Sequence, residues 1–188
     1  MTPTAMTEEL GTAQLRSPVP DVPADERRVI ETRFGTMEFA PEQAISMPRG
    51  VLGFAEHREF GLTYLPNKFI DQLMLLQSYA DPETSFLVLP MNIDAGIIDE
   101  ADLVGACATM NVAPENAVIA VIVTIRDVGG EPQITTNLRA PIILDAESRN
   151  GWQYVLPNGK YSVRHNLNIP AAADDVPSDT PADGSEQG

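Results

Sequence analysis

The segment Val118-Ile119-Ala120-Val121-Ile122-Val123-Thr124-Ile125-Arg126 decides the fold that we expect for this chain. β-Branched residues dominate it, and such side chains fit the pleated surface of a β-sheet. The pair Gly129-Gly130 follows closely, and glycine accepts the positive φ that a tight hairpin turn requires. We therefore predict a strand over Val118–Arg126 that turns back into a second strand over Gln133–Leu138.

Short apolar runs separated by turn residues continue on both sides of this hairpin, which favours an antiparallel sheet. A second hairpin is expected at Pro157-Asn158-Gly159, between strands over Gly151–Leu156 and Tyr161–Asn166. The remaining expected strands are Glu31–Phe39, Phe60–Tyr64, Leu73–Tyr79, Phe86–Leu89 and Ile142–Leu144. Consecutive hairpins over residues 118–166 indicate a meander that curls on itself to hide its edges.

The expected fold class is mostly β, at the margin of α+β: a compact antiparallel, barrel-like β domain with a few short helices. One helix is expected over Glu100–Met110, with Asp99 as its N-cap and with Leu103, Cys107 and Met110 on its buried face. Acidic residues in its first turn suit the positive end of the helix dipole.

The folded domain is expected to span residues 29–169. Residues 1–28 contain four prolines and no sustained apolar period, and residues 170–188 contain no basic residue. We expect a disordered N-terminal arm over 1–28 and a disordered acidic tail over 170–188. The sequence shows neither a signal-peptide core before Arg28 nor a run long enough to span a membrane, so we expect a soluble cytoplasmic protein. We also expect it to be a monomer.

Net charge bears on the choice of partner. The formal charge of the chain is -15 at pH 7, and such a field repels a phosphate backbone. Direct binding to nucleic acid is therefore disfavoured, whereas a basic protein partner would be attracted. The alternative is that the charge only keeps the protein soluble.

Residues that could carry catalysis all have a plainer explanation. Asp99-Glu100-Ala101-Asp102 resembles a helicase motif, but the sequence has no glycine-rich phosphate loop, and a helix start explains the same residues. Cys107 falls on the apolar face of the expected helix and is interpreted as a small buried hydrophobe. Two histidines and one cysteine do not make a structural zinc site, so no metal site is expected. The last candidates are Trp152, Tyr161 and Arg164, which could anchor a protein interface. The two aromatic residues could equally well belong to the core.

Several separated motifs, in one order, resemble the FliW family of flagellar assembly factors. The motifs are Thr32-Arg33-Phe34-Gly35, Pro48-Arg49-Gly50, Leu76-Gln77-Ser78 with Asp81-Pro82, Thr136-Asn137-Leu138-Arg139-Ala140-Pro141-Ile142, Arg149-Asn150-Gly151-Trp152-Gln153 and Tyr161-Ser162-Val163-Arg164-His165. The resemblance covers about residues 32–167. It implies a compact antiparallel, barrel-like fold with no cofactor and no catalysed reaction.

The resemblance also implies two protein partners, cytoplasmic flagellin and the RNA-binding regulator CsrA. Free factor would bind CsrA and relieve repression of flagellin translation. We expect Ile97 and Ile98, before the helix, to form part of an apolar groove for flagellin. We expect Glu100 and Asp102, at the helix start, to contact CsrA through acidic surface.

Two other functional classes remain open at this stage. A small antiparallel-barrel, flavin-binding enzyme would have a similar length, but it needs basic residues or a loop of backbone amides for the flavin phosphate. An oligonucleotide-binding barrel would need basic and aromatic residues on one face. The colour of the purified protein and a filter-binding assay at low salt distinguish these classes.

Overall fold

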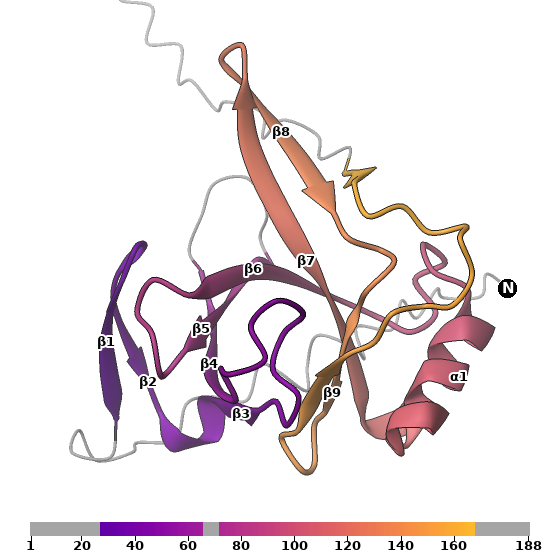
Figure 1. Ribbon diagram of the computed structural model, residues 1–188, viewed down its shortest axis with the longest axis horizontal. Coiled ribbons are helices and arrows are strands. Elements are labelled where there is room, and N and C mark those ends of the chain that lie inside the picture. The colour runs from indigo at the N-terminus through magenta and orange to yellow at the C-terminus, as the bar shows by residue number, and fades with distance from the viewer. Residues whose placement is uncertain (1–26, 66–71, 168–188) are drawn as a thin grey trace, which may run out of the picture.

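The strand β7 (Ala117–Val128) organises the computed structural model, which describes residues 27–65 and 72–167 (Figure 1). Along one edge it pairs with β6 (Ser85–Met91). Along the other edge its first half pairs with β9 (Ile142–Asp145) and its second half with β8 (Glu131–Thr136). All three pairings are antiparallel, so the strand predicted from the β-branched run and the hairpin predicted at Gly129-Gly130 are both confirmed.

A curled sheet forms most of the domain. Its strand order is β10 (Gly151–Gln153), β9, β7, β6, β5 (Met74–Ser78), β4 (Glu59–Tyr64) and β3 (Ala44–Ser46), and β8 and β11 (His165–Asn166) extend it beside β7. The two ends of this order meet at one parallel bridge between Ser46 and Asn150. The predicted antiparallel, mostly β class is therefore confirmed, although the barrel-like curl does not close into a complete barrel.

A separate two-stranded hairpin stands beside the curled sheet. It consists of β1 (Arg28–Thr32) and β2 (Gly35–Phe39), where the sequence predicted a single strand over Glu31–Phe39. The prediction was wrong because Arg33 and Phe34 form a turn, which is completed by Gly35 at a φ of 102°. The hairpin packs against the sheet through Phe39, which is buried beside Gly61 of β4.

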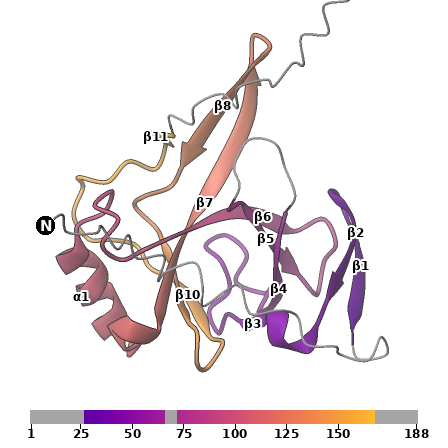
Figure 2. The same cartoon turned by 180° about the vertical axis from the view of Figure 1, so that it is seen from behind.

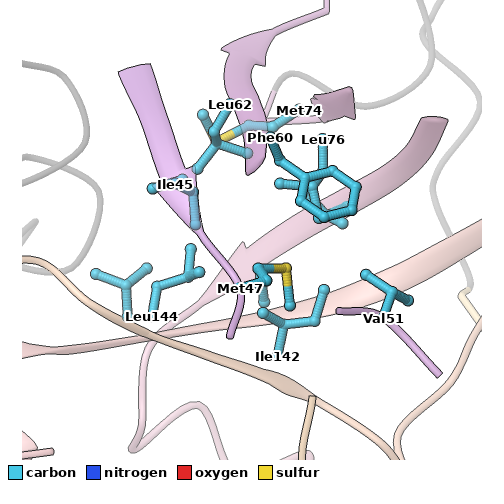
Figure 3. Close-up of a cluster of buried hydrophobic side chains, with 12 residues drawn as sticks. Ile45, Met47, Val51, Phe60, Leu62, Met74, Leu76, Ile142 and Leu144 are labelled. Atoms are coloured by element: carbon cyan, nitrogen blue, oxygen red, sulfur yellow. The ribbon is translucent and has the colours of Figure 1, made fainter. Parts of the chain in front are cut away.

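Two apolar cores lie on opposite faces of β7, because alternate side chains of a strand point to opposite sides. The inner core fills the curl of the sheet (Figure 3). It is made of Ile45, Met47, Val51, Phe60, Leu62, Met74, Leu76, Val88, Val118, Ala120, Ile142 and Leu144. The outer core lies between the sheet and the helix α1 (Glu100–Met110), which covers the other face (Figure 2).

The predicted bounds of α1 are confirmed, and Leu103 and Cys107 are buried on its inner face. Asp99 precedes the helix, but its side chain makes no capping hydrogen bond and instead pairs with Lys160. The helix ends at Asn111, which adopts a left-handed conformation with a φ of 58°. Short 3-10 helices at Pro41–Gln43 and Pro114–Asn116 complete the helical content of the described residues.

The hairpin predicted at Pro157-Asn158-Gly159 was wrong. The strand before it, β10, pairs with β9, and the only strand after it among the described residues is β11, which pairs with β8. The physical reason is tertiary, because the segment 157–162 packs on the start of α1 through hydrogen bonds rather than on its neighbour in sequence. The predicted meander was wrong as well. In a meander β9 would pair with β8, but here β9 returns to β7 and pairs with its first half, while β8 pairs with its second half along the same edge.

The arms predicted to be disordered, residues 1–28 and 170–188, lie outside the described residues apart from positions 27 and 28. Arg28 is the first residue of β1, and Arg27 forms an ion pair with Glu38 at 3.5 Å.

Candidate functional site

The four residues predicted to bind partners lie together before and within the first turn of α1, but they differ in exposure. Ile98 is 0% exposed and belongs to the outer core, whereas Ile97 is 46% exposed. Glu100 is exposed to solvent. Ile97 and Glu100 are therefore accessible to a partner without rearrangement of the core, and the Asp102 side chain is 27% exposed. The role of all four residues in binding stays a prediction.

Asp102 sits at the centre of a polar network that ties α1 to the segment 157–162. Its carboxylate accepts hydrogen bonds from the Tyr161 hydroxyl and from the Asn158 side-chain amide, the latter at 3.0 Å. The Lys160 ammonium lies 2.9 Å from the same oxygen and also pairs with Asp99. The hydrogen bond from Tyr161, followed by those from Lys160 and Asn158, lowers the pKa of Asp102 to about 2. The charge of Asp102 is therefore compensated internally.

Several residues that carry the family resemblance serve the fold. Gln77 is fully buried, and its side-chain amide nitrogen lies 3.0–3.2 Å from the carbonyl oxygens of Ser78, Asp81, Pro82 and Thr84, which share its two N–H donors. These contacts fix the turn between β5 and β6.

Gln153 acts in the same way between two other segments. Its amide nitrogen donates to the Ala140 carbonyl oxygen at 3.1 Å, and its amide oxygen accepts from the Leu52 backbone at 2.9 Å. The Asn137 side chain accepts from the backbone N–H groups of Arg139 and Ala140. Motif residues of this kind position loops and leave little polar surface for a ligand.

An open cleft lies where β6 and β7 diverge. The pairing of the two strands ends at Leu87 and Val123, but β7 continues for five more residues to Val128 together with β8 (Figure 1). The cleft has a volume of about 620 Å³. Its lining consists of Arg33, Phe34, Ser85, Phe86, Leu87, Ile122, Val123, Thr124 and Ile125.

The tip of the β1–β2 hairpin forms one wall of this cleft. The Arg33 guanidinium donates to the backbone carbonyl of Ser85 at 3.2 Å and lies 5.0 Å from the centroid of the Phe34 ring. Phe34 and Ile125 are each 36% exposed, which is a large fraction for apolar side chains beside a cavity.

Phe86, which lines the cleft, packs against two other aromatic rings. It makes an edge-to-face contact with Phe54 at 5.2 Å and a tilted contact with Phe60 at 6.4 Å. The Ser85 hydroxyl, in contrast, has no hydrogen-bond partner in the described part of the chain, although the residue is only 9% exposed. The cleft thus offers aromatic walls, one cation and one free buried hydroxyl, and these suit a polypeptide with both apolar and polar groups.

Sequence reasoning missed this cleft, because its two sides come from strands whose paired residues Leu87 and Val123 lie 36 positions apart along the chain. One signal was available. Phe34 lies in the two-residue turn Arg33-Phe34, directly before Gly35. At the tip of a hairpin its apolar ring cannot be buried by the two strands of that hairpin, so the ring is left exposed.

The other residues considered from the sequence have structural surroundings. Cys107 is buried, and burial raises the pKa of its thiol, in agreement with its interpretation as a small hydrophobe. His57 contacts the Ser78 hydroxyl at 2.8 Å. Trp152 is partly buried against the outer core and Tyr161 belongs to it, whereas Arg164 is exposed.

Among residues 27–65 and 72–167, no group of three His, Cys, Asp or Glu side chains could hold a metal ion. Within the same residues, no helix is both long and apolar enough to cross a membrane.

Comparison with known proteins gives a consistent result. The model of the FliW protein family matches residues 28–167. A flagellar assembly factor FliW from Desulfitobacterium hafniense (strain Y51) is 32% identical over 154 residues, which cover 80% of this chain and 97% of the relative. One from Moorella thermoacetica is 32% identical over 164 residues, which cover 86% of this chain and 99% of the relative.

A crystal structure of the flagellar assembly factor FliW has the same fold, with a TM-score of 0.59. The match covers 76% of this chain and 98% of the other, at 24% sequence identity.

Proposed function

Because this chain belongs to the FliW family of flagellar assembly factors, we propose that it is a cytoplasmic binding protein with two alternative partners. It holds flagellin before export, and when it is free of flagellin it binds the RNA-binding regulator CsrA and relieves repression of flagellin translation. The observation that carries the proposal is the family match over the whole described domain, residues 28–167.

Binding of an unfolded or partly folded flagellin requires exposed apolar surface on the protein that holds it. Two such surfaces support the proposal. One is the cleft between β6 and β7, and the other surrounds Ile97 before α1. A binding protein needs no bound metal or cofactor for this activity, so the proposal is for a factor without catalysis.

Binding of CsrA is supported by charge. A regulator that grips RNA carries basic surface, and the charge of -15 on this chain attracts it over a long range. Glu100 is the exposed candidate at the start of α1, and Asp102 contributes by anchoring the segment 157–162 beneath it.

The test uses purified full-length chain with flagellin and CsrA from the same bacterium. Each partner is measured separately, by isothermal titration calorimetry for affinity and by surface plasmon resonance for association rate. Both are expected to bind. Association with CsrA should slow as salt rises from low to physiological concentration, because exposed charges are then screened. Glu100→Lys should slow association further and leave flagellin affinity unchanged.

Glu83→Lys is the matched control, since Glu83 is exposed in the turn before β6 and its side chain makes no ion pair in the described part of the chain. If neither partner binds wild-type protein, the proposed function is wrong. If CsrA binds with no salt dependence and is indifferent to Glu100→Lys, the electrostatic explanation of that half is wrong.

A further inference from the structure

The second half of β7 has an open edge beside the cleft. The Ile122 carbonyl accepts a hydrogen bond from the Asn137 backbone on the β8 side, so even-numbered residues of β7 direct their backbone groups toward β8. Odd-numbered residues consequently direct theirs toward β6. Because β6 pairing stops at Val123, the N–H and C=O groups of Ile125 and Asp127 face no strand within the described residues.

The opposite edge of the same hairpin is protected. β11 pairs with Thr135 and Thr136, and the Leu167 backbone donates to the Ile134 carbonyl at 2.9 Å. Pro132 follows along that edge, where it removes a donor, and proline is a common way to block edge pairing. Within residues 27–65 and 72–167, the β7 edge has neither a covering strand nor a proline. The two edges of this hairpin therefore differ in their capacity to accept a new strand.

We propose that the open edge at Ile125–Asp127, together with the cleft, binds an extended polypeptide segment of a partner protein, which adds to β7 as a further strand. The segment places an apolar side chain against Phe34 and Phe86 and an acidic side chain near Arg33. Arg33 supports the second contact, because it is exposed and has no carboxylate partner among the described residues. The free Ser85 hydroxyl can bond a polar group of the same segment.

A second copy of this chain fits the edge poorly. If two copies paired antiparallel with the twofold axis at Arg126, the Arg126 side chains of the two copies would lie directly opposite each other. With the axis at Asp127, two carboxylates would lie opposite each other. Like charges directly opposite each other on paired strands are unfavourable. With the twofold axis at Ile125, the backbone of Val123 would have to pair with the second copy, but Val123 already pairs with Leu87 on that side. The edge therefore suits a segment of different sequence.

The identity of the segment rests on the proposed function, under which it belongs to flagellin. The test measures the affinity of full-length variants for flagellin by calorimetry, after thermal melting has shown that each variant folds. Asp127→Pro removes an N–H that faces the open edge, and Arg33→Glu reverses the charge at the cleft. Each should weaken binding by about tenfold or more, because strand addition depends on main-chain hydrogen bonds and the acidic contact becomes repulsive.

Two matched controls separate the edge from general effects. Asp127→Ala loses the same side-chain hydrogen bond to the Gly130 backbone but keeps the N–H, and Arg164→Glu makes the same charge change on an exposed residue outside the cleft. Arg164→Glu should stay within about twofold of wild type, as expected for a surface change away from the contact. Asp127→Ala lies on the edge but keeps the main-chain N–H, so it should bind flagellin clearly more tightly than Asp127→Pro.

Equal affinity of wild type, Asp127→Pro and Arg33→Glu overturns the inference and leaves the proposed function intact. Absence of flagellin binding by wild-type protein overturns the proposed function, and the inference with it. If wild-type protein is a dimer in solution and Asp127→Pro is a monomer, the edge is an interface between copies and the inference is likewise wrong.

Discussion

The Arg33 guanidinium donates to the Ser85 carbonyl at 3.2 Å, at the place where β6 would otherwise continue its pairing with β7. The backbone N–H and C=O groups of odd-numbered residues in β6 point toward β7. The Ser85 carbonyl would therefore be the next hydrogen-bond acceptor after that of Leu87 in the β6–β7 ladder. A side chain from the β1–β2 hairpin thus satisfies a strand end and, by occupying the position, keeps the two strands apart. The cleft lies where this contact and the start of β6 at Ser85 end the pairing of the two strands.

Ser85→Ala should stabilise the free protein or leave its stability unchanged. The Ser85 hydroxyl is buried without a partner, and an unsatisfied buried polar group costs about 1–3 kcal/mol. Urea unfolding should show an equal or higher midpoint, whereas flagellin binding should weaken if the hydroxyl contacts the bound segment. A lower midpoint would show that the hydroxyl already has a partner in the free protein.

Asp102→Asn should reduce stability at neutral pH but not in acid. Hydrogen bonds from Tyr161, Lys160 and Asn158 hold the pKa of Asp102 at about 2, below its usual value of 3.8. A carboxyl with a lowered pKa contributes its full stability above pH 4, and this contribution is lost as pH falls through 2.

The free energy of unfolding of Asp102→Asn and wild type should therefore converge between pH 4 and pH 2 in a urea titration. Glu100→Gln removes an exposed charge from the same helix start and is the control. A gap between Asp102→Asn and wild type that stays constant over that range would mean that the network does not depend on the ionised carboxylate.

Gln77→Met should destabilise the protein by about 1–3 kcal/mol, because four buried or half-buried carbonyl oxygens lose the amide that serves them. The loss should appear as a lower urea midpoint with an unchanged slope. Glu83→Gln, in the turn that Gln77 supports, should have no effect. Equal midpoints for Gln77→Met and wild type would show that the turn holds its shape without the side chain.

Gly50→Ala should cost more than Gly53→Ala, although both glycines have a positive φ. Each change imposes left-handed strain of about 1–2 kcal/mol on alanine. At Gly50 the new methyl carbon would also lie 2.3 Å from the Phe54 carbonyl oxygen, whereas at Gly53 it meets no atom within 4 Å. Thermal melting of the two variants should give a clearly lower midpoint for Gly50→Ala, and equal midpoints would contradict the close approach.

Local patterns were sufficient to predict the elements that depend on neighbouring residues. The strand over 118–126, the turn at Gly129-Gly130 and the bounds of α1 each follow from propensity, turn chemistry or helical period. The pairing partners did not follow in the same way. β9 pairs with β7 because the long strand leaves its first half free for another partner, and no pattern within 137–145 encodes that choice.

The candidate site depended even more on distant contacts. Whether Asp102 is available to a partner is decided by Lys160 and Tyr161, about sixty residues away. Whether Ile98 is exposed is decided by its packing in the outer core, while its neighbour Ile97 points outward. Alternation of burial between adjacent residues in a loop has no period that a sequence could reveal.

Amide hydrogen exchange at Ile125 and Asp127 tests the proposed strand addition most directly. In the free protein these two amides should exchange fast, because they face the open edge, and those of Thr124 and Arg126 should exchange slowly, because they bond to β8. Saturation with flagellin should protect Ile125 and Asp127 and change Thr124 and Arg126 little. Fast exchange at Ile125 and Asp127 in the saturated complex would contradict the account.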